Sequence, residues 1–367
     1  MITRLKWKPD FEQTVERFEA WWLGELIDRP PVTLHIRPSR PYEGPPSHHL
    51  TARQRWLDAR WRVESAIAEM ARRDYAGDSF PLFWPNVGPE ITAALFGCEL
   101  QYDDRTHWSI PIVHSCEDWQ RVAAAVPDFS VECWQAMEKM TDLALELSDG
   151  RFAVGLTDLH GNYDILAALR DPEALCMDLL DCPDAVARAG HRAAQVYVEC
   201  FNRCWAKLAA AGMGASTWTP AWHGGPMYVP SCDFWCMVSP RMAEELILPE
   251  IVFEMRPLER SIFHLDGPAA LKHLDLLLRL PQLNAIQWVY GAGAGPASRW
   301  LDVYRRCLAA GKSVQIFCQS HAEAIALLNE LGPRGVWLDV QEPFDSLAQA
   351  QAFLDDVARY SHVRGPR

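Results

Sequence analysis

His264 and Asp266 are separated by one residue in segment 261–267, an apolar run that ends at a glycine followed by Pro268. Side chains two positions apart on a β-strand point to the same face. If this segment is a buried strand, an imidazole and a carboxylate therefore face the same side near its end. Because a buried ionisable pair needs a partner, a metal or a catalytic task, the spacing predicts a functional site.

A second segment further along the chain repeats this arrangement. Residues 285–293 carry Gln287, Trp288 and Tyr290 and also run into glycines. Two neighbouring strands that both end in polar side chains and glycines indicate the rim of a site.

The composition is that of an ordinary folded protein, with 49% hydrophobic and 23% charged residues among 367. No linker, repeat or low-complexity stretch divides the chain, and α/β barrels of this size form one domain, so we expect a single domain over 1–367. The formal charge of −13 and the lack of a basic run argue against a nucleic-acid partner.

Targeting signals and cysteine usage bear on the compartment. The N-terminus has cations without an apolar stretch behind them, and no run approaches the ~18 apolar residues of a membrane span. We therefore expect a cytoplasmic protein without membrane association. The eleven cysteines are expected to be free thiols, buried as small hydrophobes. With no CxxC pair, structural zinc held by cysteines is the weaker interpretation.

Short β-rich runs alternate with longer helical patterns. Several runs are apolar nearly throughout, as expected of parallel strands covered on both faces. Eight alternations favour a (β/α)8 TIM barrel over a doubly wound sheet. A glycine-rich phosphate loop is missing after the first strand, so no NAD or nucleotide site is expected. The predicted strands span residues 32–36, 80–84, 152–158, 215–219, 262–266, 285–290, 313–318 and 336–340.

Three segments depart from a minimal barrel. Residues 1–31 form a helical N-terminal extension, with Phe11, Val15, Phe18 and Trp22 on one stripe. Residues 98–150 are an insertion with a hairpin around 108–114 and two helices. Residues 220–238 are expected to be an active-site loop, because a long aromatic-rich loop in a compact fold is usually functional.

Barrel active sites lie at the carboxyl ends of the strands, where this chain places polar residues. The candidate catalytic residues are His264, Asp266, Asp158, His160, Tyr290 and Asp233. The candidate substrate contacts are Trp84, Asn86, Trp218, His223, Gln287, Trp288 and Gln341.

Simpler structural roles compete with these assignments. Asp158 could cap the next helix, His223 could be a loop histidine without a task, and Gln287 fits a satisfied interior amide. Cys318 fits packing better than a nucleophile, because only His321 is close in sequence to lower its pKa.

Tryptophan is unusually frequent, with 16 in the chain. Large aromatics could simply fill the wide mouth of a barrel. The alternative is an aromatic cage for a methylated ammonium, which such rings attract by roughly 2 kcal/mol when it is desolvated. An acidic protein also suits a cationic substrate. The candidates for this cage are Trp84, Trp218, Trp222, Trp235 and Trp288.

Several segments are similar to the uroporphyrinogen decarboxylase superfamily. They are residues 152–161, 164–170, 239–249, 264–268 and 285–293, together with Gly88-Pro89 and Phe96-Gly97. The resemblance covers about residues 80–360 and implies a (β/α)8 barrel. Its decarboxylases carry an arginine-rich segment after the first strand, where this chain offers only Arg37 and Arg40. Their later Gly-His-Gly histidine corresponds here to Asp339, so the resemblance disfavours porphyrinogen decarboxylation.

The corrinoid-dependent methyltransferase branch of this superfamily carries a zinc site of a His-x-Cys pair and a later cysteine. The matching positions are His264, Asp266 and Asp339, so carboxylates replace both thiolates. Such a set is unsuited to activating a thiol, but it could bind Zn²⁺, Mn²⁺ or Fe²⁺. Alternatively, the carboxylates act without a metal on a cationic methyl donor.

The resemblance implies a methyltransferase-type enzyme that demethylates a small methylated amine or ether. The methyl group would pass to a separate corrinoid protein, because the Asp-x-His-x-x-Gly motif for cobalamin is absent. Asp158, His160 and Tyr290 would handle protons, and Trp218 and Trp288 would wall the pocket. One alternative is a metal-assisted decarboxylase or lyase, which predicts that Arg37, Arg40 or Lys312 reaches the cavity. Another is a small-molecule-binding barrel without catalysis.

Overall fold

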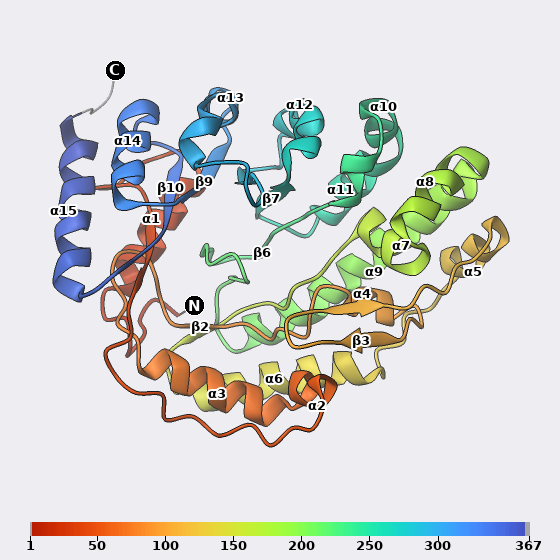
Figure 1. The fold of residues 1–367 in the computed structure, drawn as a ribbon, viewed down its shortest axis with the longest axis horizontal. Helices are drawn as coiled ribbons and strands as arrows, with labels where there is room; N and C mark the ends of the chain where they lie inside the picture. Colours follow the sequence, from red (N-terminus) through yellow and green to blue (C-terminus); the bar gives the residue numbers. More distant parts are fainter. Residues whose placement is uncertain (1, 364–367) are drawn as a thin grey trace.

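The computed structural model describes residues 2–363, which form an α/β fold around a curled parallel sheet (Figure 1). Six strands hydrogen-bond in the order β1-β10-β9-β8-β7-β6. Two strands, β2 and β5, form a separate parallel pair, and β3 and β4 form an antiparallel hairpin. The strands are β1 (Val32–Ile36), β2 (Leu82–Phe83), β3 (Leu100–Tyr102), β4 (His107–Ser109), β5 (Ala153–Val154), β6 (Met227–Tyr228), β7 (Arg260–Asp266), β8 (Ala285–Val289), β9 (Ser313–Cys318) and β10 (Val336–Phe344).

Helices cover the outer face of the sheet. α13, α14 and α15 follow β8, β9 and β10 and lie side by side in Figure 1. The helices are α1 (Phe11–Trp22), α2 (Ala52–Leu57), α3 (Ala59–Ala71), α4 (Ile91–Ala94), α5 (Trp119–Ala123), α6 (Glu132–Ser148), α7 (Asn162–Arg170), α8 (Pro172–Asp181), α9 (Pro183–Ala210), α10 (Pro240–Met242), α11 (Leu248–Glu254), α12 (Leu274–Leu278), α13 (Leu301–Ala309), α14 (His321–Leu331) and α15 (Leu347–Val363).

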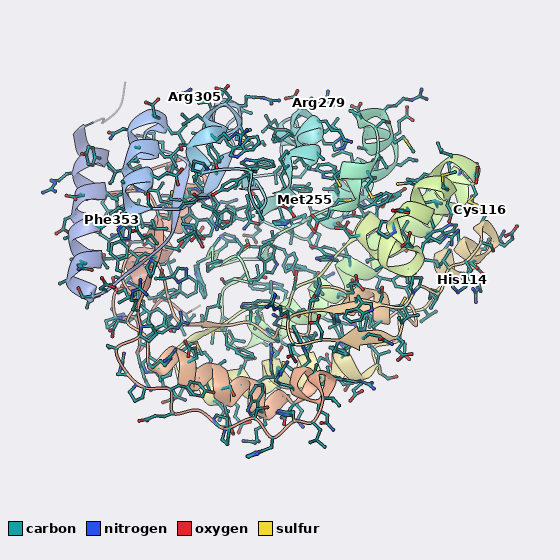
Figure 2. The ribbon with its side chains drawn as sticks, viewed as in Figure 1. His114, Cys116, Met255, Arg279, Arg305 and Phe353 are labelled. Atoms are coloured by element: carbon teal, nitrogen blue, oxygen red, sulfur yellow. A yellow bond between two sulfur atoms is a disulfide. The ribbon has the colours of Figure 1, made fainter. Side chains whose placement is uncertain are left out.

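Side-chain burial follows this layering. Met255 lies in the interior, whereas Arg279 and Arg305 lie on the outer edge (Figure 2). Both arginines form surface ion pairs, Arg279 with Glu244 and Arg305 with Glu330, at 2.8 Å in each case.

The predicted eight-stranded barrel is confirmed in part, because the hydrogen-bonded sheet does not close among the described residues. Between β1 and β2, the Ser79 hydroxyl bonds the N–H and C=O of Leu34, both at 2.8 Å, in place of a strand ladder. On the far side of β5, one backbone bond joins Leu156 N–H to Ser216 C=O at 2.8 Å. Gly155 permits this approach, since a Cβ there would lie 2.7 Å from the Ser216 oxygen.

The strand predicted at residues 215–219 is wrong. Only Ala215 makes a bridge there, an antiparallel one with His223. The strand beside β7 is β6, and the hydroxyl of its Tyr228 connects it to the chain after β5. That hydroxyl donates to Thr157 C=O at 2.6 Å and accepts from Leu159 N–H at 2.7 Å.

The three segments predicted to depart from a minimal barrel agree with the structure to different extents. Within residues 1–31, α1 is the helix, and Phe11, Phe18 and Trp22 of the predicted stripe are buried on it. The hairpin of the insertion lies earlier than expected, at β3 and β4. Residues 220–238 are not one loop: they contain β6 and the short helix η2 (Phe234–Met237), so only their second part lies near the carboxyl ends of the strands.

Candidate functional site

His264 and Asp266 lie at the end of β7 and share their surroundings with Asp233. One ligand-type atom from each of these three side chains lies within 4.8 Å of the others. We call these three residues the acidic trio. Asp233 is exposed and His264 is half-buried, so the group opens toward solvent. One imidazole and two carboxylates form a donor set that divalent Zn, Mn and Fe all accept.

Backbone contacts fix the loop that brings Asp233 to this position. Ser231 pairs with His264 as a parallel bridge, and His264 N–H donates to Pro230 C=O at 3.0 Å. The Asp164 carboxylate accepts from the N–H groups of Asp233 and Phe234, at 3.0 and 2.9 Å. The loop is therefore held against β7 from both sides.

Two further contacts orient the His264 ring. Its Nδ1 hydrogen-bonds the side-chain oxygen of Gln287, its partner in register on β8. Trp218 meets the ring edge to face, with centroids 5.3 Å apart. With Nδ1 engaged, Nε2 is the nitrogen left for a metal or substrate.

Asp158 and His160 add titratable groups beside the trio. Burial raises the pKa of Asp158, while the attraction of His160 and His264 opposes this shift. Burial alone would lower the pKa of His160, but Asp158, Asp164 and Asp233 raise it above its ordinary value. The three carboxylates thus favour the protonated form of the His160 imidazole.

A cavity of about 480 Å³ borders the trio through Asp233. His160 and Asp164 line it, and burial, followed by the repulsion of Asp233, raises the pKa of Asp164 to about 6. Burial raises the pKa of Asp266 as well. None of the described residues lining this cavity is a lysine or arginine, and four are acidic: Glu90, Asp164, Asp171 and Asp233.

A second cavity of about 470 Å³ lies toward β1 and β10. Trp218, Asp339 and Gln341 line it, so these three candidates lie together. Trp218 contacts the His264 ring and lines this second cavity, so it connects the acidic trio to that cavity.

Asp339 is not part of the acidic trio. Its carboxylate accepts from Gln315 Nε2 at 2.9 Å and from Gln341 Nε2 at 2.7 Å. Burial raises its pKa to about 6. The structure thus does not group the ligand set His264, Asp266 and Asp339, and Asp233 takes the third place instead.

Other candidates lie in packed or structural positions. Trp288 is fully buried against Trp300, and the Tyr290 hydroxyl donates to Phe317 C=O at 3.0 Å. Gln287 is buried with all its polar atoms bonded.

Trp84, Asn86 and His223 lie away from the trio. Trp84 and Asn86 line a separate surface cavity beside α3. His223 lies near the start of β7, where its ring contacts Glu19 at 2.9 Å and Glu259 at 3.2 Å. That is the end of the sheet opposite the acidic trio.

The tryptophans do not form one cage. Trp222, Trp235 and Trp288 are fully buried core residues, and Trp222 packs against Phe11 and Phe80. Trp84 and Trp218 are partly exposed, but they line different cavities. The aromatics mainly fill the interior.

Sequence reasoning missed Asp164 and Glu254. Asp164 lies in the first turn of α7, four residues after His160, and this spacing was a usable signal. Glu254 is fully buried and accepts from the backbone and side-chain N–H groups of Asn162 at 2.6 and 2.9 Å. Burial raises its pKa well above the ordinary value.

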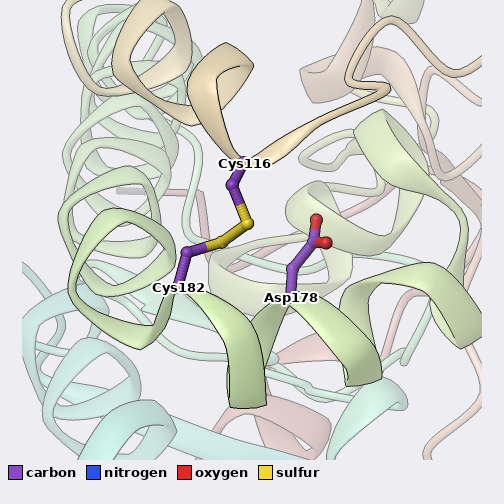
Figure 3. Close-up of side chains that lie close together, drawn as sticks. All are labelled: Cys116, Asp178 and Cys182. Carbon is purple, nitrogen blue, oxygen red and sulfur yellow. A yellow bond between two sulfur atoms is a disulfide. The ribbon is translucent and has the colours of Figure 1, made fainter.

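Cys116, Cys182 and Asp178 form a second group of ligand-type side chains (Figure 3). Cys116 and Cys182 form a disulfide, contrary to the expectation that all cysteines are free thiols. Asp178 accepts from Trp119 Nε1 at 2.9 Å and Arg170 Nε at 2.8 Å. With both sulfurs oxidised and the carboxylate engaged, this group is structural.

Comparisons with known proteins support the fold. The chain resembles a methyltransferase from Methanosarcina mazei with a TM-score of 0.61 and 12% sequence identity, over 95% of this chain and 99% of that one. No protein-family model and no curated protein sequence matches the chain. Among residues 2–363, no helix has the length and apolar character needed to cross a membrane.

Proposed function

We propose that this chain is a methyltransferase-type enzyme that demethylates a small methylated amine or ether and passes the methyl group to a corrinoid on a separate protein. The observation that carries the proposal is the acidic trio at the carboxyl end of β7, beside a cavity whose described lining contains no lysine or arginine. The resemblance in fold to a methyltransferase supports the same reaction class.

A divalent metal fits the trio. His264 would bind it through Nε2, with Asp233 and Asp266 as oxygen ligands. When bound, such an ion polarises a substrate oxygen or nitrogen as a Lewis acid. The neighbouring Gln287 would orient the imidazole, as outer-shell partners do in metal sites.

His160 would act on the leaving group. In methyl transfer from an ether, the C–O bond breaks, the electron pair stays on oxygen and the methyl carbon takes its new pair from the reduced cobalt. The alkoxide needs a proton, which a protonated His160 beside Asp158 would supply. A quaternary ammonium leaves as a neutral amine and needs no proton.

The charge of the cavity favours a cationic donor. Glu90, Asp164 and Asp233 would attract a methylated ammonium and disfavour a carboxylate. The lyase alternative predicted that Arg37, Arg40 or Lys312 reaches the cavity. Arg37 pairs with Asp345 and Arg40 with Asp74, and neither arginine lines either cavity. Lys312 is buried just before β9, where it donates to the Leu280 and Leu283 carbonyls.

The test is methyl transfer from a panel of betaines, methylamines and methoxyarenes to cob(I)alamin, with metal-replete protein. We expect turnover with at least one cationic donor and its loss in His264→Ala. The control is His191→Ala, which removes an exposed histidine paired with Glu250 on the outer helices. Failure of every donor would contradict the proposal, and the absence of a His264-dependent metal would favour a non-catalytic binding barrel.

A further inference from the structure

Four side chains, three of them buried and His264 half-buried, form a continuous line of hydrogen bonds across β7, β8, β9 and β10. His264 Nδ1 meets Gln287 Oε1, Gln287 Nε2 meets Gln315 Oε1 at 2.7 Å, and Gln315 Nε2 meets Asp339 Oδ2 at 2.9 Å. His264, Gln287 and Gln315 are partners in register on adjacent strands. The line thus joins the acidic trio to a carboxylate outside it.

The direction of each hydrogen bond follows from Asp339. An ionised carboxylate can only accept, so Gln315 must present its NH₂ group to it. Gln315 then presents its oxygen to Gln287, which in turn presents its own oxygen to His264. That oxygen can only accept, so the hydrogen of the neutral imidazole must lie on Nδ1.

Neighbouring groups support this direction. Gln287 Nε2 also donates to the Thr219 hydroxyl at 2.9 Å, and Gln341 donates to the other oxygen of Asp339. Gln287 and Gln315 are each 1% exposed, so water cannot easily replace a missing partner. Reversing the two amides would turn the Gln315 oxygen toward the carboxylate of Asp339, an acceptor facing an acceptor.

We propose that Asp339, acting through Gln315 and Gln287, is a positioning residue that holds His264 in the Nδ1–H tautomer and leaves Nε2 as its free lone pair. The inference rests on the proposed function in one respect, namely that the free Nε2 of His264 would bind a metal. The tautomer itself is a property of the metal-free chain.

The test is nitrogen NMR of the metal-free full chain labelled with ¹⁵N-histidine, with the His264 signals assigned from His264→Ala. In the native chain we expect the hydrogen on Nδ1. Gln287→Met, which removes the acceptor, and Asp339→Asn, which removes the charge, should each shift the population toward Nε2–H. Gln287→Glu keeps an oxygen acceptor beside His264 Nδ1, so this variant should retain the native Nδ1–H tautomer.

Zinc affinity gives a second measurement on the same variants. Gln287→Met should weaken Zn²⁺ binding by about 10- to 100-fold, the usual cost of losing an outer-shell partner. Gln319→Met is the matched control: this exposed glutamine follows β9 outside the hydrogen-bonded line, and its variant should keep native tautomer and affinity. Circular dichroism verifies that each variant is folded.

A hydrogen on Nε2 in the native chain would overturn the inference, as would an unchanged tautomer in folded Asp339→Asn and Gln287→Met. Because these spectra need neither metal nor substrate, the tautomer can hold even if no methyl transfer is found. That outcome would refute the proposed function alone.

Discussion

At the residue scale, the acidic trio depends on contacts between segments distant in sequence. Asp233 reaches His264 because Asp164 binds the backbone N–H groups of its loop. Asp339 is held away from the trio by Gln315 and Gln341. The trio therefore combines a strand end with a loop that precedes the strand.

The buried Asp339 predicts an unusual pH dependence of stability. Its pKa is raised to about 6 in the folded chain, against 3.8 as the ordinary value. The folded state thus binds the proton more tightly, and the free energy of unfolding falls as pH rises from about 4 to 6, by on the order of 3 kcal/mol. Urea titrations across this range should show a shallower fall in Asp339→Asn.

Asp302→Asn is the control for this measurement, because the side chain of Asp302 is 96% exposed. It should retain the native pH profile. A profile in Asp339→Asn identical to that of the native chain would show that the carboxyl of Asp339 is not responsible.

Strand-end logic located His264, Asp266, Asp158 and His160 from sequence, because these residues directly follow or end apolar runs. The position of polar residues at strand ends could not decide whether Asp233 or Asp339 joins His264 and Asp266 in the acidic trio. That choice depends on hydrogen bonds between strands and on a backbone loop, neither of which spacing in the chain encodes.

At the element scale, the sequence predicted correctly those strands that form regular backbone hydrogen-bond ladders with their neighbours. Residues 32–36 and 313–318 match β1 and β9, whereas 215–219 has one bridge in place of a ladder. The Thr51 hydroxyl caps α2 by accepting from Gln54 N–H at 3.2 Å, a capping pattern that is visible in the sequence. This helix breaks at Asp58, whose side chain caps a second helix by accepting from Trp61 N–H at 3.0 Å.

The disulfide predicts a stability difference at this scale. Cys116 and Cys182 are 66 residues apart and join the insertion to the start of α9. Closing a loop of this length should stabilise the fold by about 4 kcal/mol, through the entropy of the unfolded chain. Denaturant unfolding of Cys182→Ser under non-reducing conditions should show that loss.

Cys176→Ser is the matched control, since Cys176 is a free cysteine on the neighbouring α8. It should unfold near the native midpoint, and reducing agent should lower the native midpoint to that of Cys182→Ser. Equal midpoints for both variants without reductant would contradict a stabilising bond.

At the scale of the whole molecule, alternation of strands and helices predicted a closed eight-stranded barrel, of which the parallel strands and the helical cover are confirmed. It could not predict where the sheet opens. The openings depend on the Ser79 and Tyr228 hydroxyls, which replace backbone ladders on either side of the pair β2 and β5. The parallel strands nevertheless bring the trio and both cavities to one end of the sheet.

An anomalous diffraction map of crystals of the full chain soaked with Mn²⁺ or Zn²⁺ tests the central claim most directly. The account predicts a single strong peak within bonding distance of His264 Nε2 and of oxygens from Asp233 and Asp266. A peak at Asp339 instead, or no peak beside His264 at saturating metal, would contradict it.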